Sequence, residues 1–280
     1  MKTVILNGAR NEDRWNAEIS RLLVEEISSL GHSTDLLTLE GIRIAPCTGC
    51  FGCWVKTPGM CVIDDAGRDV ARSALLCDLL VFLTPVTFGG YSSELKKAVD
   101  RLIPLLSPFF VKIGREIHHK PRYPLYADSL PSGVTRLLEI VAAKGDRRPD
   151  HGGRRFAALI NCGFPEARQC DTAIAICRCF AREAGMEWAG GLALGGGESI
   201  GGRPLKEAGG VARNARKALD LAAAALSEGR QVPGEAVSLM ARPTVPAWMY
   251  TVIGDIGWRL KARRRGTGTR MKDRPYWLDE

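Results

Sequence analysis

Short apolar runs typical of β-strands alternate along this 280-residue chain with segments that carry a helical apolar repeat. The alternation predicts parallel strands joined by crossover helices, because parallel neighbours need a long connection between them. The run at 79–83 is apolar throughout, as expected for a strand covered on both faces. The five expected strands are 4–6, 33–39, 79–83, 156–160 and 192–194.

The helical segments between these strands have recognisable ends. An apolar stripe at three- and four-residue steps runs from Ile19 to Leu30 and should stop at Gly31. Asp65 is the expected N-cap of a helix through 75, and Ser92 or Ser93 of the next. Further helices are expected at 171–184 and 207–228. Five strands with interleaved helices describe a flavodoxin-like three-layer α/β sandwich with a five-stranded parallel sheet.

Two segments do not fit this alternation. Residues 112–150 carry four prolines around one helical patch at 133–143, which predicts an inserted lobe in a main domain that spans 1–228. Residues 229–280 form a C-terminal arm with an amphipathic stretch at 248–260. The arm carries ten Lys and Arg against five Asp and Glu, so it supplies +5 of the net charge of +8.

Composition narrows the class of protein. The chain is 45% apolar and 25% charged, an ordinary globular composition. No apolar run reaches the roughly 18 residues of a spanning helix, and the N-terminal run is too short for a signal peptide, so a soluble, cytoplasmic protein is expected. No nucleic-acid recognition element is recognisable.

The loop after the first expected strand, 8–16, leads straight into a helix. Backbone N–H groups and the helix dipole at such a place favour a phosphate group. Gly8 permits close approach, Arg10 and Arg14 add positive charge, and Asn16 is an expected cap. A polar turn without a ligand is the alternative interpretation, since the loop is poor in glycine.

The loops after the third and fourth expected strands lie where ligands bind in open parallel sheets. Adjacent glycines at 89 and 90 allow close approach, and flat aromatic faces at 88 and 91 suit a planar heteroaromatic ring. The alternative is a Gly-Gly turn whose two aromatic side chains pack into the core. The residues assigned to the ring site are Thr84, Pro85, Val86, Thr87, Phe88, Gly89, Asn161, Cys162 and Gly163.

The segment 84–89, followed by a serine-initiated helix with Leu95-Lys96 and Val99-Asp100-Arg101, resembles the flavin loop of the NADPH-dependent FMN reductase and flavodoxin-like oxidoreductase family. The resemblance covers about residues 1–225. It implies non-covalent FMN with its phosphate in loop 8–16 and its ring against 84–91 and 161–164. Ala9 and Ala17 depart from the family pattern, which has Ser and Thr there.

Four cysteines, Cys47, Cys50, Cys53 and Cys61, fall within fifteen residues in a turn-rich segment. Four thiolates are what a [4Fe-4S] cluster needs, and the spacing resembles the compact cysteine motif of iron-sulfur flavoproteins. A Cys₄ zinc site and a set of reduced or redox-active thiols are the two alternatives. The motif indicates metal or redox chemistry without deciding which.

These features predict an FMN-dependent NAD(P)H oxidoreductase that passes electrons to a quinone, a nitro compound, a flavin or a similar acceptor. The alternative is an iron-sulfur flavoprotein that exchanges electrons with a redox partner protein. No acid-base residue is nominated, since the cofactor does the chemistry. The C-terminal arm is expected to join subunits of a homo-oligomer, with peripheral contact to an anionic membrane as the less favoured role.

Overall fold

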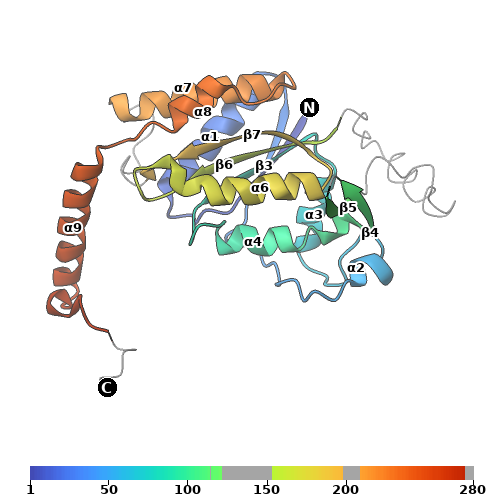
Figure 1. The fold of residues 1–280 in the computed structure, drawn as a ribbon, viewed down its shortest axis with the longest axis horizontal. Helices are drawn as coiled ribbons and strands as arrows, with labels where there is room; N and C mark the ends of the chain where they lie inside the picture. The colour runs from blue at the N-terminus through green and yellow to red at the C-terminus, as the bar shows by residue number, and fades with distance from the viewer. Residues whose placement is uncertain (114, 122–152, 198–208, 275–280) are drawn as a thin grey trace.

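The computed structural model describes residues 1–113, 115–121, 153–197 and 209–274, and its main body is a three-layer α/β sandwich (Figure 1). The central sheet has five parallel strands in the order β2-β1-β3-β6-β7. This confirms the predicted fold. The strands are β1 (Lys2–Asn7), β2 (Ser33–Thr38), β3 (Leu79–Pro85), β6 (Arg155–Asn161) and β7 (Glu187–Leu194).

Helices cover both faces of the sheet (Figure 1). The cluster that contains Ile5, Val81 and Leu83 packs against α1, α7 and α8, and the cluster that contains Leu80 and Phe82 packs against α3, α4 and α6. Successive residues of β1, β3 and β6 alternate between these clusters, because neighbouring side chains point to opposite faces. The covering helices are α1 (Arg14–Ser29), α3 (Gly67–Leu75), α4 (Ser93–Asp100), α6 (Asp171–Glu183), α7 (Gly209–Ser227) and α8 (Gly234–Met240).

Two of the three expected N-caps differ from the sequence interpretation. Ser92 caps α4 as predicted, and its side chain accepts from the Leu95 N–H. The cap of α1 is Asp13 and not Asn16, whose N–H donates to the Asp13 carboxylate at 3.1 Å. Asp65 lies two residues before α3, and its carboxylate forms an ion pair with Arg101 instead of capping the helix.

An antiparallel hairpin, β4 (Leu106–Ile113) with β5 (Glu116–Pro121), forms a second sheet that the sequence interpretation missed. It lies beside the short helix α2 (Gly52–Val55), where Trp54 Nε1 donates to the carbonyl oxygen of Leu106 at 3.1 Å. The helix predicted at 133–143 and most of the predicted inserted lobe lie outside the described residues.

The C-terminal region has two unlike parts. Ala236, Leu239 and Met240 of α8 are buried in the core cluster beneath α7. Helix α9 (Ala247–Arg264) has no buried residue and extends away from the main body (Figure 1). Within the described part of the chain, no helix is both long and apolar enough to cross a membrane. The division into a main domain and an arm at residue 229 stays a prediction.

Candidate flavin and cysteine sites

Three loops meet at the carboxyl edge of the sheet because β1, β3 and β6 are adjacent and parallel. The Gly8 N–H donates to the carbonyl oxygen of Leu83 at 2.8 Å, and the Val86 N–H donates to that of Asn161 at 2.7 Å. The strand order reverses between β1 and β3, which is where ligands bind in such sheets. The predicted phosphate and ring loops are therefore neighbours.

The loop after β3 makes a tight reversal at its tip. Thr87 and Gly90 exchange both backbone hydrogen bonds, at 3.0 and 3.1 Å, and enclose Phe88 and Gly89. Both central residues have positive φ, 53° and 84°. A bulky residue in this conformation is unusual and costs free energy, so it points to a functional constraint. The Phe88 side chain is fully exposed.

Gly8 leaves no room for a side chain. A Cβ atom there would lie 2.5 Å from Ser92 Oγ and 2.6 Å from Leu95 Cβ. The Ser92 hydroxyl donates to the carbonyl oxygen of Gly8 at 2.5 Å, and the Ser92 N–H donates to Thr84 Oγ1 at 3.0 Å. One serine therefore joins the loops after β1 and β3 as well as capping α4.

Three buried polar atoms beside these loops have no hydrogen-bond partner among the described residues: Trp15 Nε1, Asn16 Oδ1 and Asn161 Oδ1. A Cβ atom on Gly197 would lie 2.9 Å from Asn161 Nδ2 and 3.2 Å from Trp15 Cδ1, so these side chains surround the same backbone. Buried polar groups are rarely left unpaired. The Trp15 donor and the Asn161 acceptor thus fit a polar, partly aromatic ligand such as FMN.

Some of the other predicted site residues are exposed at the edge of the candidate site, and others are buried and hydrogen-bond to the loops themselves. Arg10, Thr87 and Gly163 are exposed at the rim. Thr84 is fully buried, and its hydroxyl donates to the carbonyl oxygen of Pro85 and accepts from the Ser92 N–H. The Cys162 thiol turns into its own loop, toward the carbonyl oxygens of Phe164 and Glu166. The side chain of Arg14 lies outside the described part of the chain.

Trp15 and Gly197 are site residues that sequence reasoning missed. Trp15 lies inside the loop 8–16, next to the charged residues assigned to the phosphate. Its indole N–H is a hydrogen-bond donor, which is the signal that could have marked it. Gly197 follows β7 and has no side chain that could mark it in the sequence. Its N–H donates to the carbonyl oxygen of Cys162 at 3.1 Å, which fixes the loop after β7 against the loop after β6.

The four clustered cysteines lie on the segment between β2 and α3. Cys53 is buried, Cys47 and Cys61 are half-buried and Cys50 is exposed. Burial raises the pKa of the Cys53 thiol, and the charges of the other three thiols raise it further. A hydrogen bond from the backbone of Gly52, and then one from the Thr48 side chain, lowers the pKa of Cys50.

The donor chemistry of this segment suits a thiophilic metal or cluster, since all four candidate ligands are sulfur atoms. Across the described ranges, however, no three His, Cys, Asp or Glu side chains are placed as a group that could hold a metal ion. The predicted [4Fe-4S] set therefore remains a hypothesis.

Residues 1–152 match the family described as NADPH-dependent FMN reductase, which is more than half of the chain. The chain belongs to this family. Curated relatives include the iron-sulfur flavoprotein MJ1083 of Methanocaldococcus jannaschii, 28% identical over 43% of this chain and 58% of that protein. An iron-sulfur flavoprotein of Archaeoglobus fulgidus is 30% identical over 48% of this chain and 60% of its own length. The chain thus spans somewhat more than half the length of these relatives.

Solved structures support the fold of this family member. An FMN-dependent NADH-azoreductase from Bacillus anthracis, solved with FMN, superposes with a TM-score of 0.53 at 14% identity and covers 81% of this chain and 100% of its own. The structure of RosB with a formylated riboflavin phosphate covers all of this chain and 90% of its own, at a TM-score of 0.50 and 13% identity.

Proposed function

We propose that this protein binds FMN in the loops after β1, β3 and β6 and oxidises NAD(P)H, passing the electrons to a small acceptor such as a quinone, a nitro compound or a free flavin. The observation that carries the proposal is that the strained, fully exposed Phe88 lies in a loop whose backbone is bound to Asn161, a residue whose Oδ1 has no partner among the described residues. An exposed aromatic at positive φ and a buried unpaired acceptor are both costly unless a ligand uses them.

In this proposal the residues of the chain bind and orient the cofactor. The backbone of loop 8–16, at the N-terminus of α1, binds the phosphate, with Arg10 adding positive charge at the rim. Asn161 and Trp15 bind polar atoms of the cofactor, and Phe88 packs on it. FMN, when bound, accepts hydride from the nicotinamide and donates one or two electrons.

The ring loops leave one side of the proposed site exposed to solvent. Thr87, Phe88, Gly163 and Phe164 are all exposed in the described structure. A nicotinamide and then an acceptor can reach the cofactor from this side in turn. No acid-base side chain is needed from the protein, because the cofactor itself carries the hydride.

The test is an FMN titration of purified protein, followed by stopped-flow reduction with NADH and with NADPH under anaerobic conditions. We expect stoichiometric FMN and rapid bleaching of its absorption by one nicotinamide, then reoxidation by a quinone. Protein that neither retains nor takes up FMN would contradict the proposal. Protein that binds FMN but is not reduced by either nicotinamide would leave a binding site and remove the reductase function.

A second candidate function is electron transfer by an iron-sulfur flavoprotein, with a [4Fe-4S] cluster on Cys47, Cys50, Cys53 and Cys61. The four thiols in one segment and the curated relatives, themselves iron-sulfur flavoproteins, favour it. Iron and sulfide analysis of anaerobically purified protein tests it. About four irons per chain and a brown protein are expected under this function, and a purely yellow protein contradicts it.

We further propose that the protein is cytoplasmic and forms a homo-oligomer through α9. Trp248, Ile253 and Ile256 are among the exposed apolar side chains of a helix that buries none of its residues. A variant that ends at residue 246 keeps α8 and the hydrogen bonds of Thr244 to the loop after β7, and it removes α9. It should sediment as a monomer with unchanged thermal stability, whereas an unchanged oligomer, or a full-length chain that is itself monomeric, would contradict this role.

A further inference from the structure

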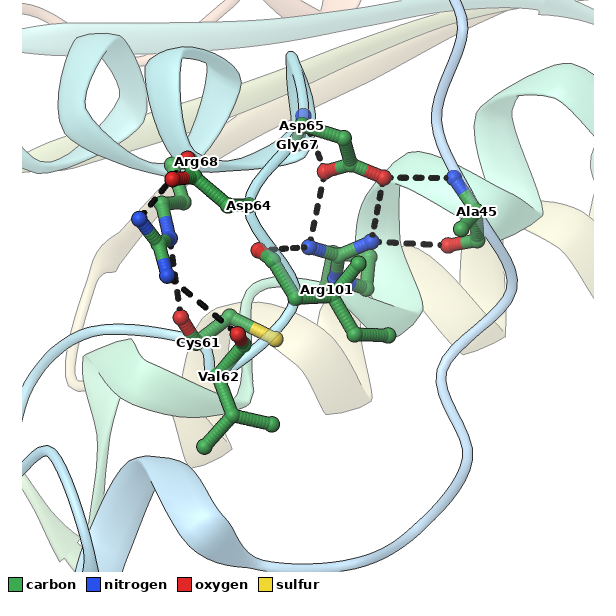
Figure 2. Close-up of polar contacts among 9 residues, drawn as sticks. Ala45, Cys61, Val62, Asp64, Asp65, Gly67, Arg68 and Arg101 are labelled. Atoms are coloured by element: carbon green, nitrogen blue, oxygen red, sulfur yellow. Dashed lines mark hydrogen bonds and ion pairs between the residues drawn. The ribbon is translucent and has the colours of Figure 1, made fainter.

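Arg101, the C-cap of α4, is the largest fully buried side chain among the described residues, with 1% of its surface exposed. Its guanidinium group faces the Asp65 carboxylate in a bidentate ion pair, with Nη1 2.9 Å from Oδ2 and Nη2 2.8 Å from Oδ1 (Figure 2). Burying a charged side chain is unfavourable unless it is paired and hydrogen-bonded. The groups that bind the buried guanidinium therefore indicate the role of Arg101 in the structure.

The guanidinium also binds two backbone carbonyl oxygens that lie far apart in the sequence. Nη1 donates to Ala45 at 2.8 Å, and Nη2 donates to Ile63 at 3.1 Å (Figure 2). Ala45 is two residues before Cys47, and Ile63 is two residues after Cys61. One side chain thus holds both ends of the cysteine segment.

Asp65 completes the same closure from the other side. Oδ2 accepts from the Ala45 N–H at 2.7 Å, and Oδ1 accepts from the Gly67 N–H at 2.9 Å. Ala45 therefore binds Asp65 through its N–H and Arg101 through its carbonyl oxygen. The segment between these anchor points has only the four-residue helix α2 as regular structure, so the anchors supply order that secondary structure does not.

We propose that Arg101 is a positioning residue for the thiol site: paired with Asp65, it clamps 45–65 into a closed loop and so sets the spacing of Cys47 and Cys61. A planar guanidinium can reach two carbonyl oxygens and both carboxylate oxygens at once, whereas a lysine ammonium cannot. The clamp is independent of the electron acceptor and of whether the thiols bind a cluster, a zinc ion or nothing.

Arg68 provides a matched control. It also donates to this segment, to the carbonyl oxygens of Cys61 at 2.9 Å and Val62 at 3.3 Å, and it pairs with Asp64 (Figure 2). It contacts only the Cys61 end. An Arg68→Met substitution therefore removes an arginine that binds the loop from α3, without opening the clamp.

The experiment compares hydrogen exchange of loop peptides and site-resolved alkylation of the cysteines by iodoacetamide in the wild type, Arg101→Lys, Asp65→Asn and Arg68→Met, each as full-length protein. Arg101→Lys should accelerate exchange across 45–65 and alkylation of Cys61 by roughly tenfold or more, as expected when several bonds to a charged group are lost. Exchange in β1, β3 and β6, FMN content and alkylation of the exposed Cys50 should not change.

Asp65→Asn should give the same pattern more weakly, and it decides the question if Arg101→Lys does not fold. Arg68→Met should affect only the peptides around 61–64. Three outcomes overturn the proposal: no acceleration in the loop, equal acceleration in the sheet, which would make Arg101 a general stabiliser, or an Arg68→Met pattern that matches Arg101→Lys.

Discussion

Val86 donates its backbone N–H to the carbonyl oxygen of Asn161 at 2.7 Å, which ties the loop after β3 to the last residue of β6. The backbone of Asn161 is thereby occupied, while its side-chain Oδ1 is buried without a partner in the described structure. The backbone of this residue serves the fold, and its side chain is the part that we propose binds the ligand.

The first prediction separates these two roles. Asn161→Leu keeps the backbone bond and replaces the unpaired polar atom by an apolar group of similar size. Because no side-chain bond is lost at Oδ1, the free energy of unfolding of the apoprotein should stay within about 1 kcal/mol of the wild type. FMN should bind roughly tenfold more weakly in a fluorescence titration. Unchanged affinity would remove Asn161 from the site.

The second prediction concerns Phe88. Asn tolerates the left-handed conformation, so Phe88→Asn should not destabilise the apoprotein in urea unfolding and can stabilise it by about 1 kcal/mol. Losing the aromatic face should raise the Kd for FMN roughly tenfold. Phe109→Asn is the control. It removes an exposed aromatic side chain from β4, away from the proposed site, and should leave the Kd for FMN unchanged.

The third prediction is an order of thiol reactivity. Burial raises the pKa of Cys77 and of Cys177 to about 12 each, whereas the pKa of the exposed Cys50 is lowered by the hydrogen bond from Gly52. The thiolate is the reactive form. Mass spectrometry after limited alkylation of metal-free protein should find Cys50 modified first and Cys77 and Cys177 only after unfolding. Early modification of Cys77 would contradict the described burial.

The fourth prediction is a pH dependence at the hairpin. Burial raises the pKa of Glu183, but hydrogen bonds with the His118 ring at 2.7 Å and from the His119 N–H at 3.3 Å outweigh it, so the folded pKa lies below its usual value of 4.5. A lowered pKa stabilises the fold above the unfolded value, and this stabilisation is lost as the pH falls through the folded value.

Glu183→Gln should therefore lower the free energy of unfolding by about 1 kcal/mol near neutral pH, a value kept small because the carboxylate is partly exposed. The difference from the wild type should shrink as the pH drops below 4.5. Thermal unfolding followed by circular dichroism across this range measures it. A difference that does not depend on pH would mean that the contact is not electrostatic.

Much of the fold could be predicted because its signals are local. The apolar run at 79–83 predicts a buried strand, and the apolar stripe from Ile19 to Ile27 predicts a helix with one buried face. The structure confirms both elements. The β4–β5 hairpin was not predicted, because its strands carry the exposed apolar residues Phe109, Phe110 and Ile117. These residues interrupt the alternation of apolar and polar positions by which a strand is recognised.

The candidate sites were predictable only in outline. Loops can be located from the strands that precede them, and the structure places Gly8, the Phe88 loop and the end of β6 next to one another. Roles that depend on contacts between distant segments leave no local pattern. Asp65 has the sequence context of a helix cap, yet its partner Arg101 is 36 residues away and visible only in three dimensions.

The two caps of helix α4 contact different sites: Ser92, its N-cap, binds Gly8 at the proposed flavin site, and Arg101, its C-cap, binds Ala45 of the cysteine segment. Eight residues at 1.5 Å each make a rod of about 12 Å, and each residue turns the helix by about 100°. Inserting a single alanine in this rod would leave Ser92 in place and swing Arg101 a quarter-turn off its target. Natural variation in the length of this helix should therefore be rare, however freely its exposed side chains change.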